Sequence, residues 1–122
     1  MPVKWRIEGV VLLESDAEAT FEEWVAALHE AFNDDAFRRG MGVVHDTRQL
    51  TRLLHSGEVS RRIAFVAQWM AKTGATRWAV VVPGRGVEYG MARMGEAFAD
   101  HEAVAFRVFQ DDLAEAIAWA RG

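Results

Sequence analysis

The sequence contains no cysteine, only two prolines and a single tyrosine among its 122 residues. Without cysteine the chain forms no disulfide, carries no thiol nucleophile and builds no thiolate metal site. This composition fits a reducing compartment. The segment that starts Met-Pro-Val-Lys-Trp-Arg lacks an uninterrupted apolar run of the length that a signal peptide or a membrane span needs. We therefore expect a cytoplasmic protein with no membrane span.

Charge is distributed unevenly along the chain, although the formal net charge is only −4. Residues 38–93 include ten lysines and arginines against three acids, whereas residues 14–35 include eight acids and neither lysine nor arginine. Phosphate contacts dominate affinity for nucleic acid, so an acidic protein is a poor candidate for general nucleic-acid binding. We expect no nucleic-acid partner. A local basic patch and ordinary solvated helix faces of different sign both stay open as explanations.

Segments with strand-like and helix-like patterns alternate along the chain. Short apolar or alternating runs predict strands at 5–13, 41–45, 78–82 and 104–109. Apolar residues spaced by three or four predict a helix after each strand. The first helix opens with a Thr20–Glu23 capping box, the second spans 56–72, the third spans 87–98, and the last runs from Asp112 through Trp119.

This order predicts the α/β class, with a single small, mostly parallel sheet of four to five strands and covering helices. A chain of 122 residues is the size of one domain and buries roughly two-thirds of the surface that its unfolded form exposes. We therefore expect one domain over residues 1–122.

Motifs that carry catalysis or bind cofactors are incomplete in this sequence. Gly84, Gly86 and Gly90 follow a predicted strand, but their spacing is not that of a dinucleotide loop and no phosphate-binding lysine follows. His45, Asp46 and His55 lack the helical spacing of a zinc motif. No nucleophile elbow is present. The sequence predicts a protein that is not an enzyme and binds no cofactor or metal.

Basic residues follow two of the predicted strands, at the edge where ligands and partners bind in open parallel sheets. Arg48 and Arg52 follow the second strand, Ser56 starts the second helix, and Arg85 follows the third strand. Helix N-termini add exposed N–H groups and the positive ends of helix dipoles. We expect these four residues to form an interaction or anion-binding surface. The alternative is that the arginines are ordinary solvated loop residues.

Methionine and tryptophan are unusually frequent, which suggests a second hypothesis. Met41, Met70, Met91 and Met94, with the five tryptophans, could line a pocket for a small apolar or lipid-like ligand, because methionine adapts to irregular shapes. Most of these residues also fall on the apolar helix stripes, where core packing explains them. A closed apolar cavity of roughly 300 Å³ or more would favour the ligand.

Three segments of the chain, in order, carry a family resemblance. Val43-Val-His-Asp46-Thr-Arg48, Tyr89-Gly-Met-Ala-Arg93-Met and the segment 109–119 resemble a strand end, the start of the third helix, and the last strand with its closing helix in SpoIIAA-like proteins. These belong to the STAS-like group, which is related to anti-sigma factor antagonists and linked structurally to CRAL-TRIO-like lipid-binding domains.

The resemblance implies a non-enzymatic regulatory or protein-interaction module with a protein partner, and it is compatible with a homo-oligomer. It also implies a phosphoacceptor at the start of the second helix, where a phosphate adds nearly two negative charges. The family motif there is an aspartate, two serines and a glycine. This chain has Leu54-His55-Ser56-Gly57, which lacks the acid and leaves Ser56 as the candidate phosphoacceptor. The carrier of a small apolar ligand is the alternative function.

Overall fold

Five strands form one sheet, and their order across it follows their order in the sequence. The computed structural model describes residues 2–51, 56–83, 95 and 105–122. The strands are β1 (Val3–Ile7), β2 (Val11–Ser15), β3 (Val43–Asp46), β4 (Trp78–Val82) and β5 (Phe106–Gln110). Neighbours from β2 to β5 run parallel, but β1 runs antiparallel to β2. The α/β class is confirmed. The sheet is mixed, so the prediction of a mostly parallel sheet is wrong.

The difference arises in the N-terminal segment, where one strand was expected over 5–13. A tight turn divides that segment into β1 and β2: Gly9 has a φ of 73°, and the Glu8 amide donates to the Val10 carbonyl at 3.0 Å. Glycine adopts a positive φ without steric cost, so Gly9 lets the chain reverse here. The apolar residues after Gly9 suit a strand in either case, so their composition does not distinguish one long strand from two short ones.

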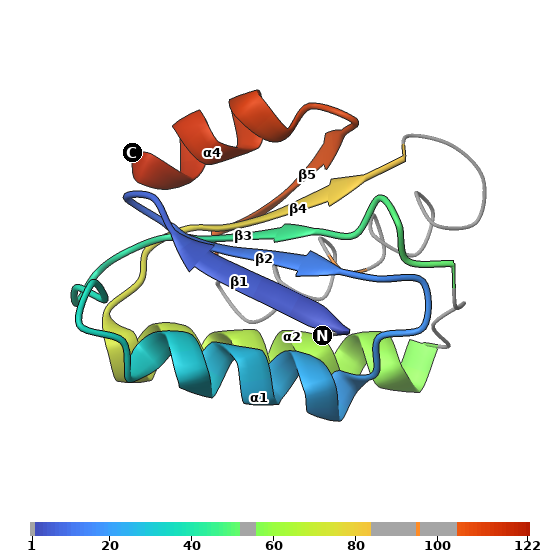
Figure 1. Ribbon diagram of the computed structural model, residues 1–122, viewed down its shortest axis with the longest axis horizontal. Helices are drawn as coiled ribbons and strands as arrows, with labels where there is room; N and C mark the ends of the chain where they lie inside the picture. Colours follow the sequence, from blue (N-terminus) through green and yellow to red (C-terminus); the bar gives the residue numbers. More distant parts are fainter. Residues whose placement is uncertain (1, 52–55, 84–94, 96–104) are drawn as a thin grey trace.

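Helices cover both faces of the sheet (Figure 1). The helices α1 (Phe21–Phe32) and α2 (Ser56–Thr73) lie on one face, and α4 (Leu113–Arg121) lies on the other. Alternate strand residues point to opposite faces, so each strand contributes to two separate cores. The larger core lies under α1 and α2 and includes Leu13, Val43 and Trp78 with Trp24 and Leu28. The smaller core includes Leu12, Val44, Val81 and Phe109 with Ala116 and Ala120 of α4.

Local capping signals in the sequence are confirmed. The Thr20 hydroxyl accepts a hydrogen bond from the Glu23 amide at 3.2 Å, and the Glu23 carboxylate accepts one from the Thr20 amide at 2.8 Å. At the start of α4, the Asp112 carboxylate accepts a hydrogen bond from the Glu115 amide at 2.9 Å. Each contact satisfies a backbone N–H that has no partner within its helix, which fixes where α1 and α4 begin.

The remaining predicted elements are found close to their expected bounds. The expected strand 78–82 is β4, the expected helix 56–72 is α2, and β3 and β5 are shifted from the expected 41–45 and 104–109 by one or two residues. The expected helix 87–98 lies outside the described residues, apart from Gly95, which is helical. Met41 and Met70 pack against the larger core, as core packing predicts, while Met91 and Met94 lie outside the described residues. Within the described ranges, no helix combines the length and the apolar character needed to cross a membrane.

Gly42 permits the close approach of α4 to the sheet. A Cβ atom placed on Gly42 would overlap the Ala120 carbonyl group at the C-terminal end of α4. Both contact atoms in that group belong to the backbone, so no side-chain rotation relieves the overlap. Because Gly42 has no side chain, the end of α4 can pack closely against β3 and β4.

We expect Gly42→Ala to lower the free energy of unfolding by about 1–3 kcal/mol, the usual cost of overpacking a closed contact. Urea denaturation measures this change. The matched control is Gly57→Ala at an exposed position of α2, where alanine favours the helix and stability should be equal or slightly higher. Equal stability of Gly42→Ala and the unmodified protein would contradict this packing.

Candidate functional site

The carboxyl ends of β2 to β5 lie along one edge of the sheet, which we call the carboxyl edge (Figure 1). Each described helix follows a strand and returns in the opposite direction, so α1, α2 and α4 all begin at this edge. The edge at which we expected binding is therefore formed despite the antiparallel β1. It joins the strand ends, the connection after β3 and three helix N-termini within the described part of the chain.

Ser15 and His45 form a buried pair on the face covered by α1 and α2. Ser15 ends β2 and His45 lies on β3, and the Ser15 Oγ lies 2.7 Å from the His45 Nε2. The imidazole also stacks on Trp24, with ring centroids 5.8 Å apart. Both side chains are almost fully buried. The pair joins two neighbouring strands and satisfies polar groups that would otherwise be costly to bury.

The surroundings of His45 strongly disfavour its protonation. The pKa of His45 is lowered from 6.5 to about 3, first by burial and then by the positive charge of Arg62, against the opposing effect of Asp46. A general base works best with a pKa near the working pH. His45 therefore stays neutral near pH 7 and serves as a hydrogen-bonding partner of Ser15.

Asp46 and Arg48 close the turn that follows β3. The Arg48 Nε and Nη2 donate to the two Asp46 carboxylate oxygens at 3.0 and 2.9 Å, and the Arg48 amide donates to Asp46 Oδ1 at 3.1 Å. Burial by itself raises the pKa of Asp46, but the hydrogen bonds and charge of Arg48 outweigh it and lower that pKa. Arg48 is thus engaged by a buried carboxylate of its own chain, which limits what it can offer to an external anion.

A third pair lies in the first turns of α2. The Glu58 carboxylate accepts hydrogen bonds from the Arg62 Nη2 at 3.0 Å and the Arg62 Nε at 3.2 Å, and both side chains are largely buried. The Arg62 guanidinium lies 5.1 Å from the centre of the Trp24 ring. Because Trp24 also stacks on His45, its ring links this ion pair to the buried Ser15–His45 pair.

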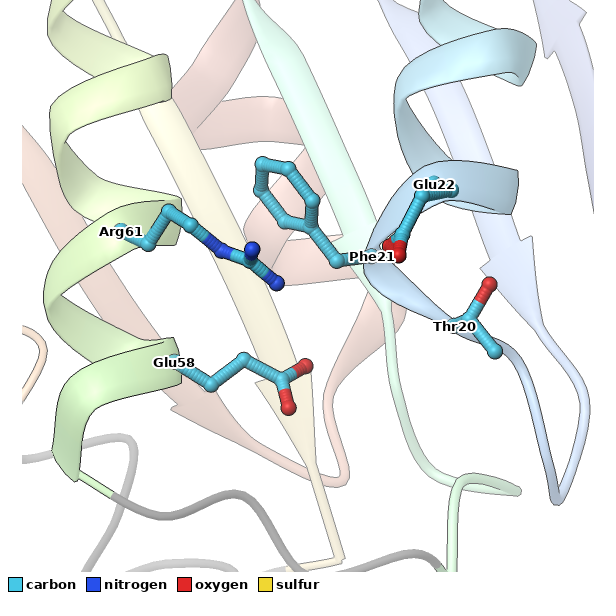
Figure 2. A pocket seen from close by; sticks show the side chains of 5 residues that line it. All are labelled: Thr20, Phe21, Glu22, Glu58 and Arg61. Atoms are coloured by element: carbon cyan, nitrogen blue, oxygen red, sulfur yellow. The ribbon is translucent and has the colours of Figure 1, made fainter.

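A shallow hollow opens between the N-terminal ends of α1 and α2 (Figure 2). Its volume is about 190 Å³, and its lining residues are Thr20, Phe21, Glu22, Glu58 and Arg61. The exposed Arg61 guanidinium lies 4.3 Å from the centre of the half-buried Phe21 ring. The hollow is smaller than the roughly 300 Å³ that small-molecule pockets usually provide. It offers one cation, one aromatic ring and the exposed Glu22 carboxylate to an approaching group. The Glu58 carboxylate in its wall is already paired with Arg62.

The expected surface residues are only partly described. Arg48 lies at the carboxyl edge in its pair with Asp46. Ser56 is the first residue of α2, but its side chain lies outside the described part of the structure. Arg52 and Arg85 lie outside the described residues. The surface that these four residues were expected to form stays a prediction.

Sequence patterns missed three residues that the fold brings to this edge. Ser15 was not paired with a base, because its partner His45 is 30 residues away and only the β2–β3 register brings them together. Phe21 and Arg61 were assigned only to helices. The sequence showed Arg61 only as a basic residue near the start of the predicted helix 56–72. Its contact with Phe21 depends on how α1 and α2 pack against each other, which the sequence does not show.

The described residues contain no cluster of three or more histidine, aspartate or glutamate side chains that could hold a metal ion. His45 and Asp46 lie next to each other on β3, but they engage Ser15 and Arg48 respectively. The candidate histidine His55 lies outside the described residues.

Comparison of the chain with protein-family models, with curated proteins and with solved structures finds no match. The resemblance to SpoIIAA-like proteins therefore stays a prediction from the three sequence segments.

We expect the free energy of unfolding to fall as the pH drops below about 6.5, because unfolded His45 binds a proton that the folded protein excludes down to about pH 3. The loss from this group is at most roughly 1.4 kcal/mol per pH unit. Protonation of Asp46 adds to the loss at lower pH, since its folded pKa is also lowered. Urea denaturation at pH 7 and pH 5 measures the slope. His45→Gln, which does not titrate, should have a shallower slope; an unchanged slope would contradict the assignment.

Proposed function

We propose that the protein is a non-enzymatic, STAS-like protein-interaction module of the cytoplasm that binds a partner protein at its carboxyl edge. The observation that carries this proposal is the pairing of polar groups at that edge. Ser15 with His45, Asp46 with Arg48, and Glu58 with Arg62 engage one another in buried contacts, so they brace the edge rather than converge on an open cleft. Catalytic sites need a reactive group within reach of the substrate.

The exposed part of the edge has the chemistry of a protein interface. Arg61 and the half-buried Phe21 stack at the rim of an open hollow, and Glu22 beside them is exposed. Arginine and aromatic residues dominate the binding energy of many protein interfaces, while shallow polar surroundings form their rims. We place the centre of the partner contact on Phe21 and Arg61.

Arg61 is a sharper probe of this contact than Arg48. Loss of Arg48 would leave the buried Asp46 carboxylate without its main donor, which itself costs stability. Arg61 makes its described contact with one aromatic ring and is exposed, so its replacement leaves the buried pairs intact.

We expect Arg61→Glu to weaken partner binding by at least about tenfold, because hot-spot replacements usually cost more than 1 kcal/mol. The immobilised protein and its variant are exposed to extract from the source cells, and every captured protein is quantified by mass spectrometry. Lys4→Glu is the matched control, since it makes the same charge change at another exposed position, on β1. A partner retained equally by all three proteins would contradict the proposed contact.

A phosphate on Ser56 would regulate the same edge in this proposal. Ser56 is the first residue of α2, where the positive end of the helix dipole stabilises negative charge. We expect Ser56→Asp and Ser56→Ala to differ in affinity for the partner identified by capture, measured by calorimetry. Ser60→Asp, an exposed position one turn further along α2, controls for added charge. Equal affinities of the two Ser56 variants would exclude the switch and leave the interaction itself standing.

A further inference from the structure

Five basic side chains gather at the edge of the sheet opposite the carboxyl edge. The C-terminal ends of α1, α2 and α4 and the starts of the parallel strands meet at this edge. Together they form what we call the basic rim: Arg38, Arg39, Lys72, Arg77 and Arg121. Arg77 is half-buried and the other four are exposed.

Within the described residues, the four rim arginines donate to backbone carbonyl groups instead of carboxylates. Arg39 Nη1 donates to the Lys72 carbonyl at 3.1 Å, and Arg77 Nη1 donates to the Trp119 carbonyl at 2.8 Å. The Arg121 Nη2 donates to the Glu8 carbonyl at 2.8 Å. These contacts hold the guanidinium groups in place while leaving their charges without a bound anion.

Nearby carboxylates within the described structure have other partners. Glu8 accepts a hydrogen bond from Arg6 at 2.8 Å, and Asp34 accepts one from the Ala36 amide at 2.9 Å. Arg38 donates to the Asp35 backbone carbonyl at 2.6 Å, not to its carboxylate. Asp34 and Asp35 are exposed and keep their negative charges, but the five rim cations outnumber them. The rim is therefore a positive surface on a protein whose formal net charge is −4.

Aromatic rings lie beside rim cations on both faces of the sheet. The Lys72 Nζ lies 4.6 Å from the centre of the Phe32 ring, which packs against Phe37 at 5.2 Å. On the other side of the sheet, the Arg77 guanidinium lies 5.3 Å from the Trp119 ring. Phe32, Phe37 and Trp119 are all half-buried, so each presents some surface to solvent.

Helix dipoles explain part of this arrangement. A cation in the last turn of a helix is stabilised by the negative end of the dipole, and Lys72 and Arg121 occupy such positions. Arg38, Arg39 and Arg77 lie outside the helices. Arg39 and Arg77 nevertheless donate to last-turn carbonyl groups of α2 and α4, so they also stabilise helix ends. One such hydrogen bond uses a single guanidinium N–H group and leaves the positive charge unneutralised.

We propose that the basic rim is a second interaction surface, which binds an acidic segment of a partner protein. Arginine forks bind carboxylates with two parallel hydrogen bonds, and arginine beside half-exposed aromatic rings is the composition of an interface core. The inference rests on the proposed function only in taking a protein as the partner, since it concerns the opposite edge of the sheet.

A short acidic segment fits the rim better than a nucleic acid. A nucleic acid is a long polyanion that extends past the rim, where the exposed acids of this protein repel it. A second copy of the chain offers exposed acids too, such as Asp16 and Glu18, but separate surface ion pairs contribute little against the entropy of association. Several carboxylates on one flexible segment engage the rim together.

The test uses a fluorescent synthetic peptide that alternates glutamate with leucine and contains one tryptophan. Its affinity for the full chain is measured by fluorescence polarisation at low and high salt. We expect salt-sensitive binding that weakens about fivefold or more in Lys72→Glu, as the loss and reversal of an ion pair imply. Lys4→Glu, with the same charge change on β1, should bind as the unmodified protein does.

Arg39→Gln is a second variant that removes one rim charge without reversing it, and it should weaken binding by a smaller factor. Circular dichroism confirms that each variant is folded.

Equal weakening by Lys4→Glu and Lys72→Glu would overturn the proposal, because it would show bulk attraction. Stronger competition by a duplex DNA of equal charge than by unlabelled peptide would overturn it in favour of nucleic acid. Concentration-dependent self-association that Lys72→Glu abolishes would overturn it in favour of a second copy.

Discussion

The parallel direction of β2 to β5 is the constraint on which the rest of this structure depends. Parallel neighbours require a crossover connection, and α1 and α2 provide it by running back against the strands. The helix α4, after β5, returns in the same direction (Figure 1). All described helices therefore begin at the carboxyl edge and end at the basic rim.

Aligned helices give the molecule an electrical polarity. Each described helix has an acidic residue in its first turn and a basic residue in its last turn, which stabilises both ends of its dipole. The uneven distribution of charge along the sequence does not follow these edges, since the segment 38–93 supplies cations to both, such as Arg61 at the carboxyl edge and Lys72 at the basic rim. We propose a different binding role for each edge, and both roles use groups left exposed after the buried pairs have formed.

Sequence patterns predicted the features that depend on neighbouring residues. Thr20 and Asp112 were identified as helix caps because a cap and its partner lie three residues apart. The strand Trp78–Val82 was identified because a short, continuous apolar run ended by proline is typical of a buried parallel strand. Patterns failed at Gly9, where one glycine within an apolar segment turned one predicted strand into a hairpin.

The candidate site was less predictable, because its contacts join distant parts of the chain. Ser15 meets His45 through strand register, and Arg61 meets Phe21 through helix packing. Arg48 was correctly expected after the second of the predicted strands, but the sequence did not show that Asp46 would hold its guanidinium. A basic residue near a strand end is a binding group only if its own chain leaves it free.

The parallel direction of α1 and α2 is the most direct consequence of this topology, and the absence of cysteine makes it easy to measure. Spin labels on cysteines at positions 22 and 61, and in a second protein at positions 22 and 72, give two distances by pulsed electron paramagnetic resonance. Glu22 and Arg61 line the same hollow, whereas Lys72 lies over Phe32 at the far end of α1. We predict that the 22–72 distance is clearly the longer of the two, because position 72 lies eleven helical residues, roughly 16 Å, further along α2 than position 61. A 22–72 distance equal to or shorter than the 22–61 distance would contradict it.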